Sequence, residues 1–394
     1  MANVLCVYEN KIATVLATEN FLKALNNYDS RINVKFLTVL EVTKKDLTEC
    51  DILYMLRPNN AYFGRLAKTA HNLGCLVIFF LDDDLMNLPT GNPNIPWRKK
   101  GLAYSAKQSD IIISSSPYIC KKYSINYCIQ RSFQLNTPVL ENEIKQHIDG
   151  KNEKLKIVYA AGLSHTVFFD CFIKPVIKRL DDLCGERISL TFMGVHPDLD
   201  INELKMPISF IEPMLLNEYR TRIEKENFDI GLAPLTTTDF TKCKYFNKFI
   251  EYAMFGIVGL YSNTEPYTFV VNDKKNGFLI GDSPDDWLNS ICNLVNNPEL
   301  LNKCRIEAYE TLRRTFNEKI IFENLIKEIP EFTKEHNEQQ KKPNSLFIYK
   351  MMYKMSRVGD WGYKFVFYFR KGGIKEVFLG IKRRRKTIKL EKSL

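Results

Sequence analysis

The chain has 394 residues, of which 45% are hydrophobic and 12% aromatic, and this is more than one ordinary core accommodates, so two domains are expected. The net charge of +10 is concentrated at one end. Residues 341–394 contain sixteen of the 56 Lys and Arg but only three of the 46 Asp and Glu. Residues 1–340 therefore contain 40 Lys and Arg and 43 Asp and Glu. This nearly neutral body argues against a globular nucleic-acid-binding protein.

The cysteine pattern and the N-terminal sequence indicate in which cellular compartment the protein is expected. The ten cysteines are scattered without a Cys-x-x-Cys pair, which is typical of reduced cytosolic cysteines rather than of a disulfide framework or a zinc site. The opening MANVLCVYEN runs directly into an expected strand, without the features of a signal peptide. No apolar stretch reaches the roughly 18–20 residues that span a bilayer. We therefore expect a cytoplasmic protein.

Short apolar strands alternate with helical segments in the first third of the chain. Strands are expected at VLCVY, VKFLTVL, DILYML, LVIFFL and DIIISS, and helices at ATVLATENFLKALNNY and NAYFGRLAKTAHNLG. This order is typical of βαβ units, in which parallel strands form one sheet with helices on both faces. The predicted fold class is therefore α/β.

The same alternation restarts after an expected linker at Pro138 and the charged stretch ENEIKQHIDGKNEK. Strands are expected at LKIVYAAG, ISLTFMG, ISFIEP, DIGLAPL and IVGLYS, with helices between and after them. We predict an N-terminal domain at 1–150, a second domain at 151–335 and an extension at 336–394. Ligands of open parallel sheets bind beyond the carboxyl ends of the strands, so the segments directly after strands carry the candidate site.

One such segment, FFLDDDLMNLP, places Asp82, Asp83 and Asp84 directly after a buried strand. Adjacent carboxylates repel one another, and this crowding can raise a pKa enough to make a general base. An Asx-rich turn or a helix cap is the structural alternative.

Two further segments follow strands of the second domain. Small residues let a ligand approach the backbone, and a histidine can hydrogen-bond a phosphate or a sugar hydroxyl. A structural histidine and a plain turn are the alternatives. The candidates are Gly162, Ser164 and His165 in AAGLSHT, and Glu265, Pro266 and Tyr267 in SNTEPYTFVV.

The stretch CKYFNKFIEYAMFGIVGLYS predicts a helix with an apolar stripe from Phe246 to Ile257. Lys244, Lys248 and Glu251 are spaced four and three apart and are expected to share the other face. Cations at a helix start oppose the macrodipole, and an anion bound there would reverse that penalty. A solvated lysine face is the alternative.

The C-terminal extension interleaves cations with aromatic and aliphatic residues, among them Trp361, Tyr363, Phe365, Phe367 and Phe369, and ends in the run Lys-Arg-Arg-Arg-Lys at 382–386. This composition favours binding of residues 346–394 to an anionic membrane surface. A helical extension packed on the domains is the alternative, and RNA binding has no supporting motif.

The order of FDIGLAPL, CKYFNKFIEYAMFGIVGLYSNTEPYTFVV, KNGFLI and DDWLNSICNLVNNPELLNKCRIEAY resembles glycosyltransferases of the GT-B fold, family 1/4-like. This broad group includes bacterial capsule, lipopolysaccharide and teichoic-acid transferases. KIVYAAGLSH and LTFMG resemble the start of its nucleotide-binding domain, and FFLDDDLMNLP resembles a stretch of the acceptor-side domain in some members. The resemblance covers about residues 1–330.

The resemblance implies two Rossmann-like domains and transfer of a sugar from a nucleotide-diphosphate donor to a growing, lipid-linked surface glycan at the inner face of the membrane. Lys244 and Lys248 would hold the diphosphate, Glu251 of the Lys-x-x-Glu-Tyr pattern would hold the ribose, and Tyr252 follows it. Main-chain groups near Pro213 would lie by the base. Neither a metal nor another cofactor is expected.

Many retaining members have a second Glu eight positions before the ribose-binding one, and here that position is Cys243, which leaves retention versus inversion open. An inverting enzyme needs a base, for which Asp82, Asp83 and Asp84 are the candidates. Two alternatives stay open: a non-catalytic nucleotide-sugar-binding scaffold at a membrane, and a metal-dependent enzyme of GT-A or phosphatase type that uses Asp82 and Asp84 as a DxD motif.

Overall fold

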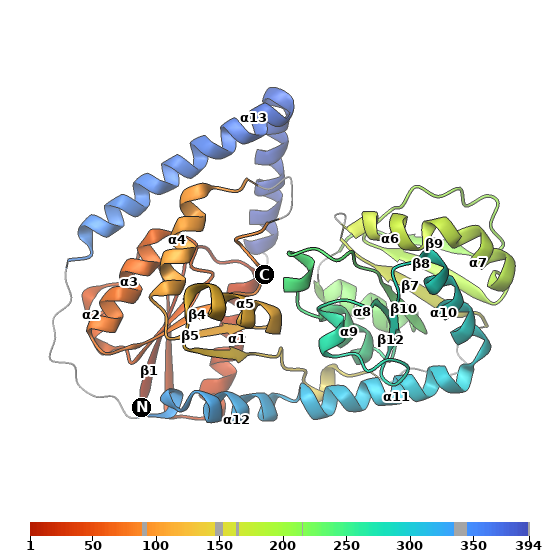
Figure 1. Ribbon diagram of the computed structural model, residues 1–394, viewed down its shortest axis with the longest axis horizontal. Coiled ribbons are helices and arrows are strands. Elements are labelled where there is room, and N and C mark those ends of the chain that lie inside the picture. Colours follow the sequence, from red (N-terminus) through yellow and green to blue (C-terminus); the bar gives the residue numbers. More distant parts are fainter. Residues whose placement is uncertain (89–92, 146–152, 163–164, 215, 335–344, 393–394) are drawn as a thin grey trace. The chain divides into compact units, whose positions relative to one another are not determined.

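The computed structural model describes residues 1–88, 93–145, 153–162, 165–214, 216–334 and 345–392, and the chain forms two compact units. Unit 1 comprises Met1–Leu135 and Phe322–Leu394, and unit 2 comprises Asn136–Ile321 (Figure 1). Each unit is built on a six-stranded sheet in which all neighbouring strands are parallel. The predicted α/β class with two Rossmann-like units is confirmed.

The sheet of unit 1 has the strand order β2-β1-β3-β4-β5-β6. β3 and β5 are buried along their whole length, as expected for strands covered by helices on both faces. The five predicted strands and two predicted helices are present, whereas α2, α4, α5 and β6 were not predicted. The elements are β1 (Ala2–Tyr8), α1 (Ala13–Tyr28), β2 (Ile32–Thr38), α2 (Lys44–Glu49), β3 (Ile52–Leu56), α3 (Ala61–Asn72), β4 (Leu76–Phe80), α4 (Pro96–Lys107), β5 (Ile111–Ser114), α5 (Pro117–Tyr127) and β6 (Arg131–Gln134).

Two sequence features position the helices near the carboxyl edge of this sheet. The Asn60 side chain caps α3 by accepting a hydrogen bond of 2.9 Å from the Tyr62 backbone N–H. At Gly101 of α4, a Cβ atom would lie 2.5 Å from the backbone of Asn60 and Ala61, so glycine allows α4 to pack closely on the start of α3.

The sheet of unit 2 has the order β12-β11-β10-β7-β8-β9, with a buried apolar cluster on each face. The completely buried Trp287 of α10 belongs to one cluster and Phe249 of α9 to the other. The elements are β7 (Leu155–Ala160), α6 (Thr166–Phe172), α7 (Ile177–Cys184), β8 (Ile188–Met193), β9 (Ile208–Ile211), α8 (Leu216–Glu226), β10 (Ile230–Ala233), α9 (Asn247–Met254), β11 (Val258–Ser262), β12 (Phe278–Ile280), α10 (Pro284–Asn296) and α11 (Pro298–Thr315), with short 3-10 turns at η1 (Glu141–Glu143), η3 (Lys174–Val176), η4 (Thr241–Cys243) and η5 (Tyr267–Phe269).

The chain returns to unit 1 within α12 (Glu318–Glu328) and continues through η6 (Pro330–Thr333) to α13 (Phe347–Lys392). The Phe322 ring lies 5.4 Å from the Phe21 ring and 5.3 Å from the Tyr28 ring of α1. Residues 322–334 therefore pack with the N-terminal sheet, although they were predicted to belong to the second domain at 151–335.

α13 packs on α3 of unit 1 and is joined to it by buried charges (Figure 1). The Asp360 carboxylate accepts hydrogen bonds from Trp97 Nε1 (2.8 Å) and Arg98 Nε (2.9 Å). Arg98 also donates to Glu9 at 2.6 and 2.8 Å, and the Tyr353 hydroxyl donates to Glu9 at 2.8 Å. The C-terminal extension is thus a helix fixed to unit 1 along its inner side. No helix within the described part of the chain is both long and apolar enough to cross a bilayer.

Candidate functional site

The carboxyl edge of the unit 2 sheet carries most of the predicted donor-binding residues. Gly162 and His165 follow β7, Pro213 follows β9, and Glu265 follows β11. Gly162 and Pro213 are exposed, His165 and Glu265 are partly buried, and Ser164 lies outside the described residues. A Cβ atom at Gly162 would meet nothing within 4 Å, so the protein itself does not require glycine there.

The lysine-bearing helix is shorter than predicted. α9 begins at Asn247, and Lys244 lies before it in extended conformation (ψ 161°), after the 3-10 turn η4. The expectation that Lys244 shares a helical face with Lys248 and Glu251 is therefore wrong, because the buried side chains of Cys243 and Phe246 mimic a helical stripe across a turn. Lys248 lies in the first turn, and no side chain caps that end of α9.

Lys244 is instead directed at the β7 loop. Its Nζ lies 3.0 Å from His165 Nε2, and a lysine ammonium can only donate in this pair. Burial of the ring, and then the charges of Lys244 and Lys248, lower the pKa of His165 to about 4. The imidazole is therefore neutral at pH 7, with its proton on Nδ1. The Tyr159 hydroxyl fixes this loop by donating to the His165 carbonyl at 2.7 Å.

Lys248 forms a second cluster with Glu251 and with Tyr219 of α8. Lys248 Nζ donates to Glu251 Oε1 at 2.8 Å and lies 3.4 Å from the Tyr219 hydroxyl, which also donates to Glu251. Burial, and then the negative charge of Glu251, raise the pKa of Tyr219. The Lys248 and Glu251 side chains keep about a quarter of their surface exposed (26% and 24%), so a ligand can reach both.

Two predicted donor-binding residues lie in the interior. Tyr252 has no exposed surface, and its hydroxyl donates to the Leu232 carbonyl at 3.0 Å. Tyr267 is 7% exposed and packs against the Tyr261 ring at 4.8 Å. Tyr252 therefore supports the interior behind the lysines and offers no group to a ligand, which corrects the role predicted for it, whereas Tyr267 keeps only a small exposed surface.

The carboxyl edge of the unit 1 sheet carries the aspartates. One Asp82 oxygen accepts hydrogen bonds from Thr14 Oγ1 (2.5 Å) and Arg57 Nη1 (3.0 Å). The other, Oδ1, is buried and has no hydrogen-bond partner among the described residues. Asp83 is the most exposed of the three carboxylates, at 42% of its side chain, and lies 3.8 Å from Arg57. Arg57 follows β3 with φ 48°, a left-handed conformation that arginine rarely adopts.

Asp84 has a different environment. It is completely buried and accepts hydrogen bonds from Lys122 Nζ (2.7 Å), the Tyr123 hydroxyl (2.7 Å), Asn87 (2.8 Å) and the Met86 N–H (3.1 Å). Burial opposes ionisation of this carboxyl, but the donors more than offset it and hold its pKa below the usual value. Asp84 therefore anchors the loop, and Asp82 and Asp83 are the aspartates that a substrate could meet.

Arg57, Thr14 and Tyr219 were not predicted from the sequence. Arg57 directly follows a predicted strand. The criterion that pointed to the aspartates, a position just beyond the carboxyl end of a strand, therefore applied to Arg57 as well. Nothing in the sequence indicated Tyr219, because only the sheet order brings α8 beside α9. In the described ranges, no group of three or more His, Cys, Asp or Glu side chains is arranged to hold a metal ion.

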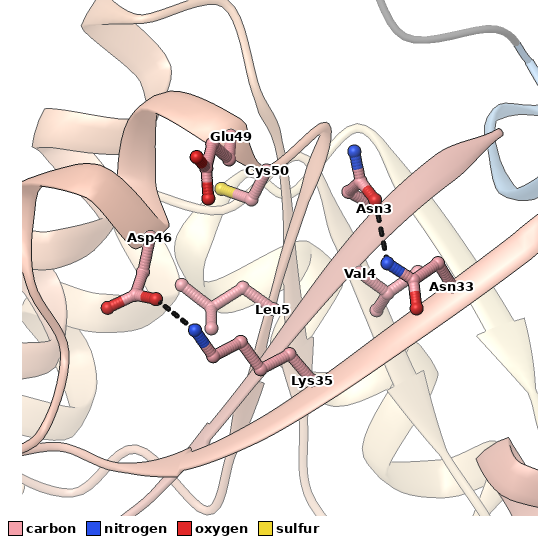
Figure 2. Close-up of a pocket in the computed structure, with 8 residues that line it drawn as sticks. All are labelled: Asn3, Val4, Leu5, Asn33, Lys35, Asp46, Glu49 and Cys50. Carbon is pink, nitrogen blue, oxygen red and sulfur yellow. Dashed lines mark hydrogen bonds and ion pairs between the residues drawn. The ribbon is translucent and has the colours of Figure 1, made fainter.

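A pocket of about 350 Å³ lies where β1 and β2 begin, beside α2, and contains none of the predicted residues (Figure 2). Four of its polar side chains are paired with one another: Asn33 donates to Asn3 at 2.9 Å, and Lys35 donates to Asp46 at 2.5 Å. Asp46 is also held by Thr43, the cap of α2. Glu49, which also lines the pocket, pairs with Lys45 at 3.5 Å, so these contacts give no indication of a ligand.

No protein-family model and no curated protein sequence matches the chain. Solved structures are similar in fold. HepE of Anabaena, in complex with UDP-glucose, has 11% identity and a TM-score of 0.60, covering 84% of this chain and all of that one. The lipopolysaccharide outer core galactosyltransferase WaaB has 14% identity and a TM-score of 0.56, covering 84% and 99%.

A putative UDP-N-acetylglucosamine 2-epimerase from Listeria monocytogenes is also similar, with 11% identity and a TM-score of 0.50, covering 86% of this chain and 98% of that one. At these identities the similarity shows the fold alone. The chain has the GT-B fold of two Rossmann-like units, as predicted, and not the GT-A architecture of one of the alternatives.

Proposed function

We propose that this protein is a glycosyltransferase that moves a sugar from a nucleotide-diphosphate donor to a growing glycan. The observation that carries the proposal is the pair of cations at the carboxyl edge of the unit 2 sheet. Lys244 rests against a neutral histidine, and Lys248 shares one carboxylate with a tyrosine. Two ammonium groups at one edge of the sheet suit a ligand that carries two negative charges.

The donor step follows from these contacts. Lys244 and Lys248 bind the diphosphate and stabilise the charge that develops on it as the sugar–phosphate bond breaks. Glu251, held in place by Tyr219 and Lys248, accepts hydrogen bonds from the ribose hydroxyls. Backbone groups at Gly162 and Pro213 border the ligand. UDP bound to HepE makes a uridine nucleotide the first donor to try.

The acceptor step is assigned to unit 1. Asp82 or Asp83 takes the proton of the acceptor hydroxyl, with Arg57 and Thr14 fixing the Asp82 carboxylate. This base makes the transfer inverting. Cys243 stands at the position of the second glutamate of retaining relatives and is only 1% exposed, so its side chain offers no substitute. The acceptor is proposed to be lipid-linked, at the inner face of a membrane.

A screen of nucleotide-sugar donors, with detection of the released nucleoside diphosphate, tests the proposal. Release that requires an added glycan or lipid-linked acceptor is the expected result. An isomerised nucleotide sugar formed without acceptor would identify an epimerase, which shares the fold. Tight donor binding without release under any condition would favour a nucleotide-sugar-binding scaffold.

A further inference from the structure

The outer side of α13 is an unbroken apolar stripe. Between residues 347 and 369, the side chains that point away from Tyr353 and Asp360, at about 100° per residue, are all apolar or glycine. They include Val358 (74% exposed), Phe347 (73%) and Met355 (67%). The stripe consists of Phe347, Ile348, Met351, Met355, Val358, Gly362, Phe365, Val366 and Phe369.

The inner side of α13 fixes the direction of this stripe. Asp360 is 5% exposed and bonded to Trp97 and Arg98, and Tyr353 is 6% exposed and bonded to Glu9. Tyr363 packs edge-on against Trp97 at 5.5 Å. The helix therefore cannot rotate to bury its apolar side without breaking a buried charge network.

Cations accompany the stripe. Residues 347–371 contain six Lys and Arg, of which Arg357 donates to Glu9 of unit 1 at 2.7 Å, and their one acidic residue, Asp360, accepts from Arg98. At Gly372 and Gly373 the helix breaks, and the following segment returns to place Gly380 against the Tyr368 ring. A second copy of such a positively charged helix would be repelled, whereas an anionic lipid surface is attracted.

We infer that the outer stripe of α13 lies in the headgroup region of an anionic bilayer, with its axis along the surface, and that this holds unit 1 beside the membrane. The stripe would hold the protein beside the lipid-linked acceptor of the proposed function. Membrane binding itself does not depend on that function, and only its purpose rests on it. Aromatic and aliphatic residues bury at the acyl boundary, and lysines and arginines stay at the headgroups.

Co-sedimentation of the full chain with vesicles of phosphatidylcholine, alone or mixed with phosphatidylglycerol, tests the surface. We expect binding to the anionic vesicles, reduced on going from about 0.1 M to about 1 M salt, which shortens the Debye length from about 10 Å to 3 Å. The double variant V358D/F365D should lower the partition coefficient by about tenfold or more, because two apolar anchors become anions.

The matched control is I125D/I306D, which introduces the same charges at isoleucines of α5 and α11 that are 68% and 63% exposed. It should bind vesicles nearly as well as the wild type. Brominated lipids should quench the fluorescence of Trp361, which is 60% exposed, and W361F should abolish that component.

Binding of V358D/F365D at the wild-type level, or equal loss in both double variants, would overturn the inference. A concentration-dependent dimer that V358D/F365D abolishes, without vesicle binding, would assign the stripe to a second copy of the chain. Calorimetry with UDP on the same variants separates the two proposals, since donor binding in unit 2 should be unaffected whether or not the membrane surface is correct.

Discussion

The carboxyl edges of the two sheets have the same architecture and opposite electrostatics. In unit 2, Lys248 pairs with Glu251 and Lys244 lies against the neutral His165, so the two lysines and the glutamate carry a net charge of +1. In unit 1, three aspartates share Arg57 and Lys122, so the five side chains carry a net charge of −1.

This contrast shows how one fold prepares two chemical tasks. A positive edge suits a diphosphate leaving group, and a negative edge suits the proton of an acceptor hydroxyl. The difference arises from the loops and helices that follow the strands, because the central strands β3, β5, β10 and β11 are buried along their whole length in both sheets. Removing one charged or titratable side chain at a time separates its effects on binding, turnover and stability.

The largest effect is expected for the unit 1 carboxylates. Asp82→Asn or Asp83→Asn should lower kcat by about 10²–10⁴-fold, because the amide keeps the size of the carboxylate but cannot accept the acceptor proton. The UDP dissociation constant should stay within about twofold, because these residues belong to the other unit. Steady-state kinetics and calorimetry measure the two quantities. Wild-type turnover in both variants would place the base elsewhere.

The aspartates also show what the sequence can and cannot distinguish. Their position after an apolar strand was predictable from the alternation of elements, as was the whole of α1, Ala13–Tyr28. Their roles were not, because Asp84 becomes an anchor only through Lys122 and Tyr123, 38 and 39 residues away. The spacing of residues along the sequence does not predict these contacts, because they depend on the order of the strands in the sheet.

The orientation of the C-terminal extension also depends on contacts between residues that are far apart in the sequence. Its mixed basic and aromatic composition indicated an interfacial segment, but composition does not order side chains around a helix axis. Asp360 contacts Trp97 and Arg98 across more than 260 residues of sequence. Long-range contacts of this kind determine which aromatic residues of α13 turn inward, such as Tyr363, and which remain exposed, such as Phe365.

The next effect concerns the positive edge. Lys248→Met keeps the apolar stem and removes the charge-assisted hydrogen bond, at a cost of roughly 1.5–3 kcal/mol, so UDP should bind about 10–150-fold more weakly by calorimetry. The control Lys303→Met changes an exposed lysine of α11 and should leave affinity unchanged. Equal affinity in wild type and Lys248→Met would remove Lys248 from the donor site.

A smaller effect, on stability, is expected at Asp84. Asp84→Asn leaves the partly buried Lys122 ammonium without its carboxylate and should lower the free energy of unfolding by about 2 kcal/mol. Chemical denaturation at pH 7 measures this change. At the same time the UDP dissociation constant should not move. A stable variant with abolished turnover would instead place Asp84 in the chemistry, beside or in place of its neighbours.

The smallest effect is a pH dependence at His165. Its pKa is about 4 in the folded chain and about 6.5 when unfolded, so the unfolded state takes up the proton first as pH falls. The stability contributed by the neutral ring is therefore lost between pH 6.5 and pH 4. Because the ring is partly exposed, we expect about 1 kcal/mol between pH 7 and pH 5.

His165→Gln removes this titration but retains a hydrogen-bonding group near Lys244. Between pH 7 and pH 5, the wild type should lose about 1 kcal/mol more unfolding free energy than His165→Gln, as measured by urea denaturation. A bound diphosphate would stabilise the protonated ring, so UDP binding near pH 5 should take up a proton in the wild type and not in the variant. Calorimetry in buffers of different ionisation enthalpy detects that proton. If no proton is taken up, the diphosphate does not lie beside His165. The contact between Lys244 and His165 would then no longer support a role for Lys244 in donor binding.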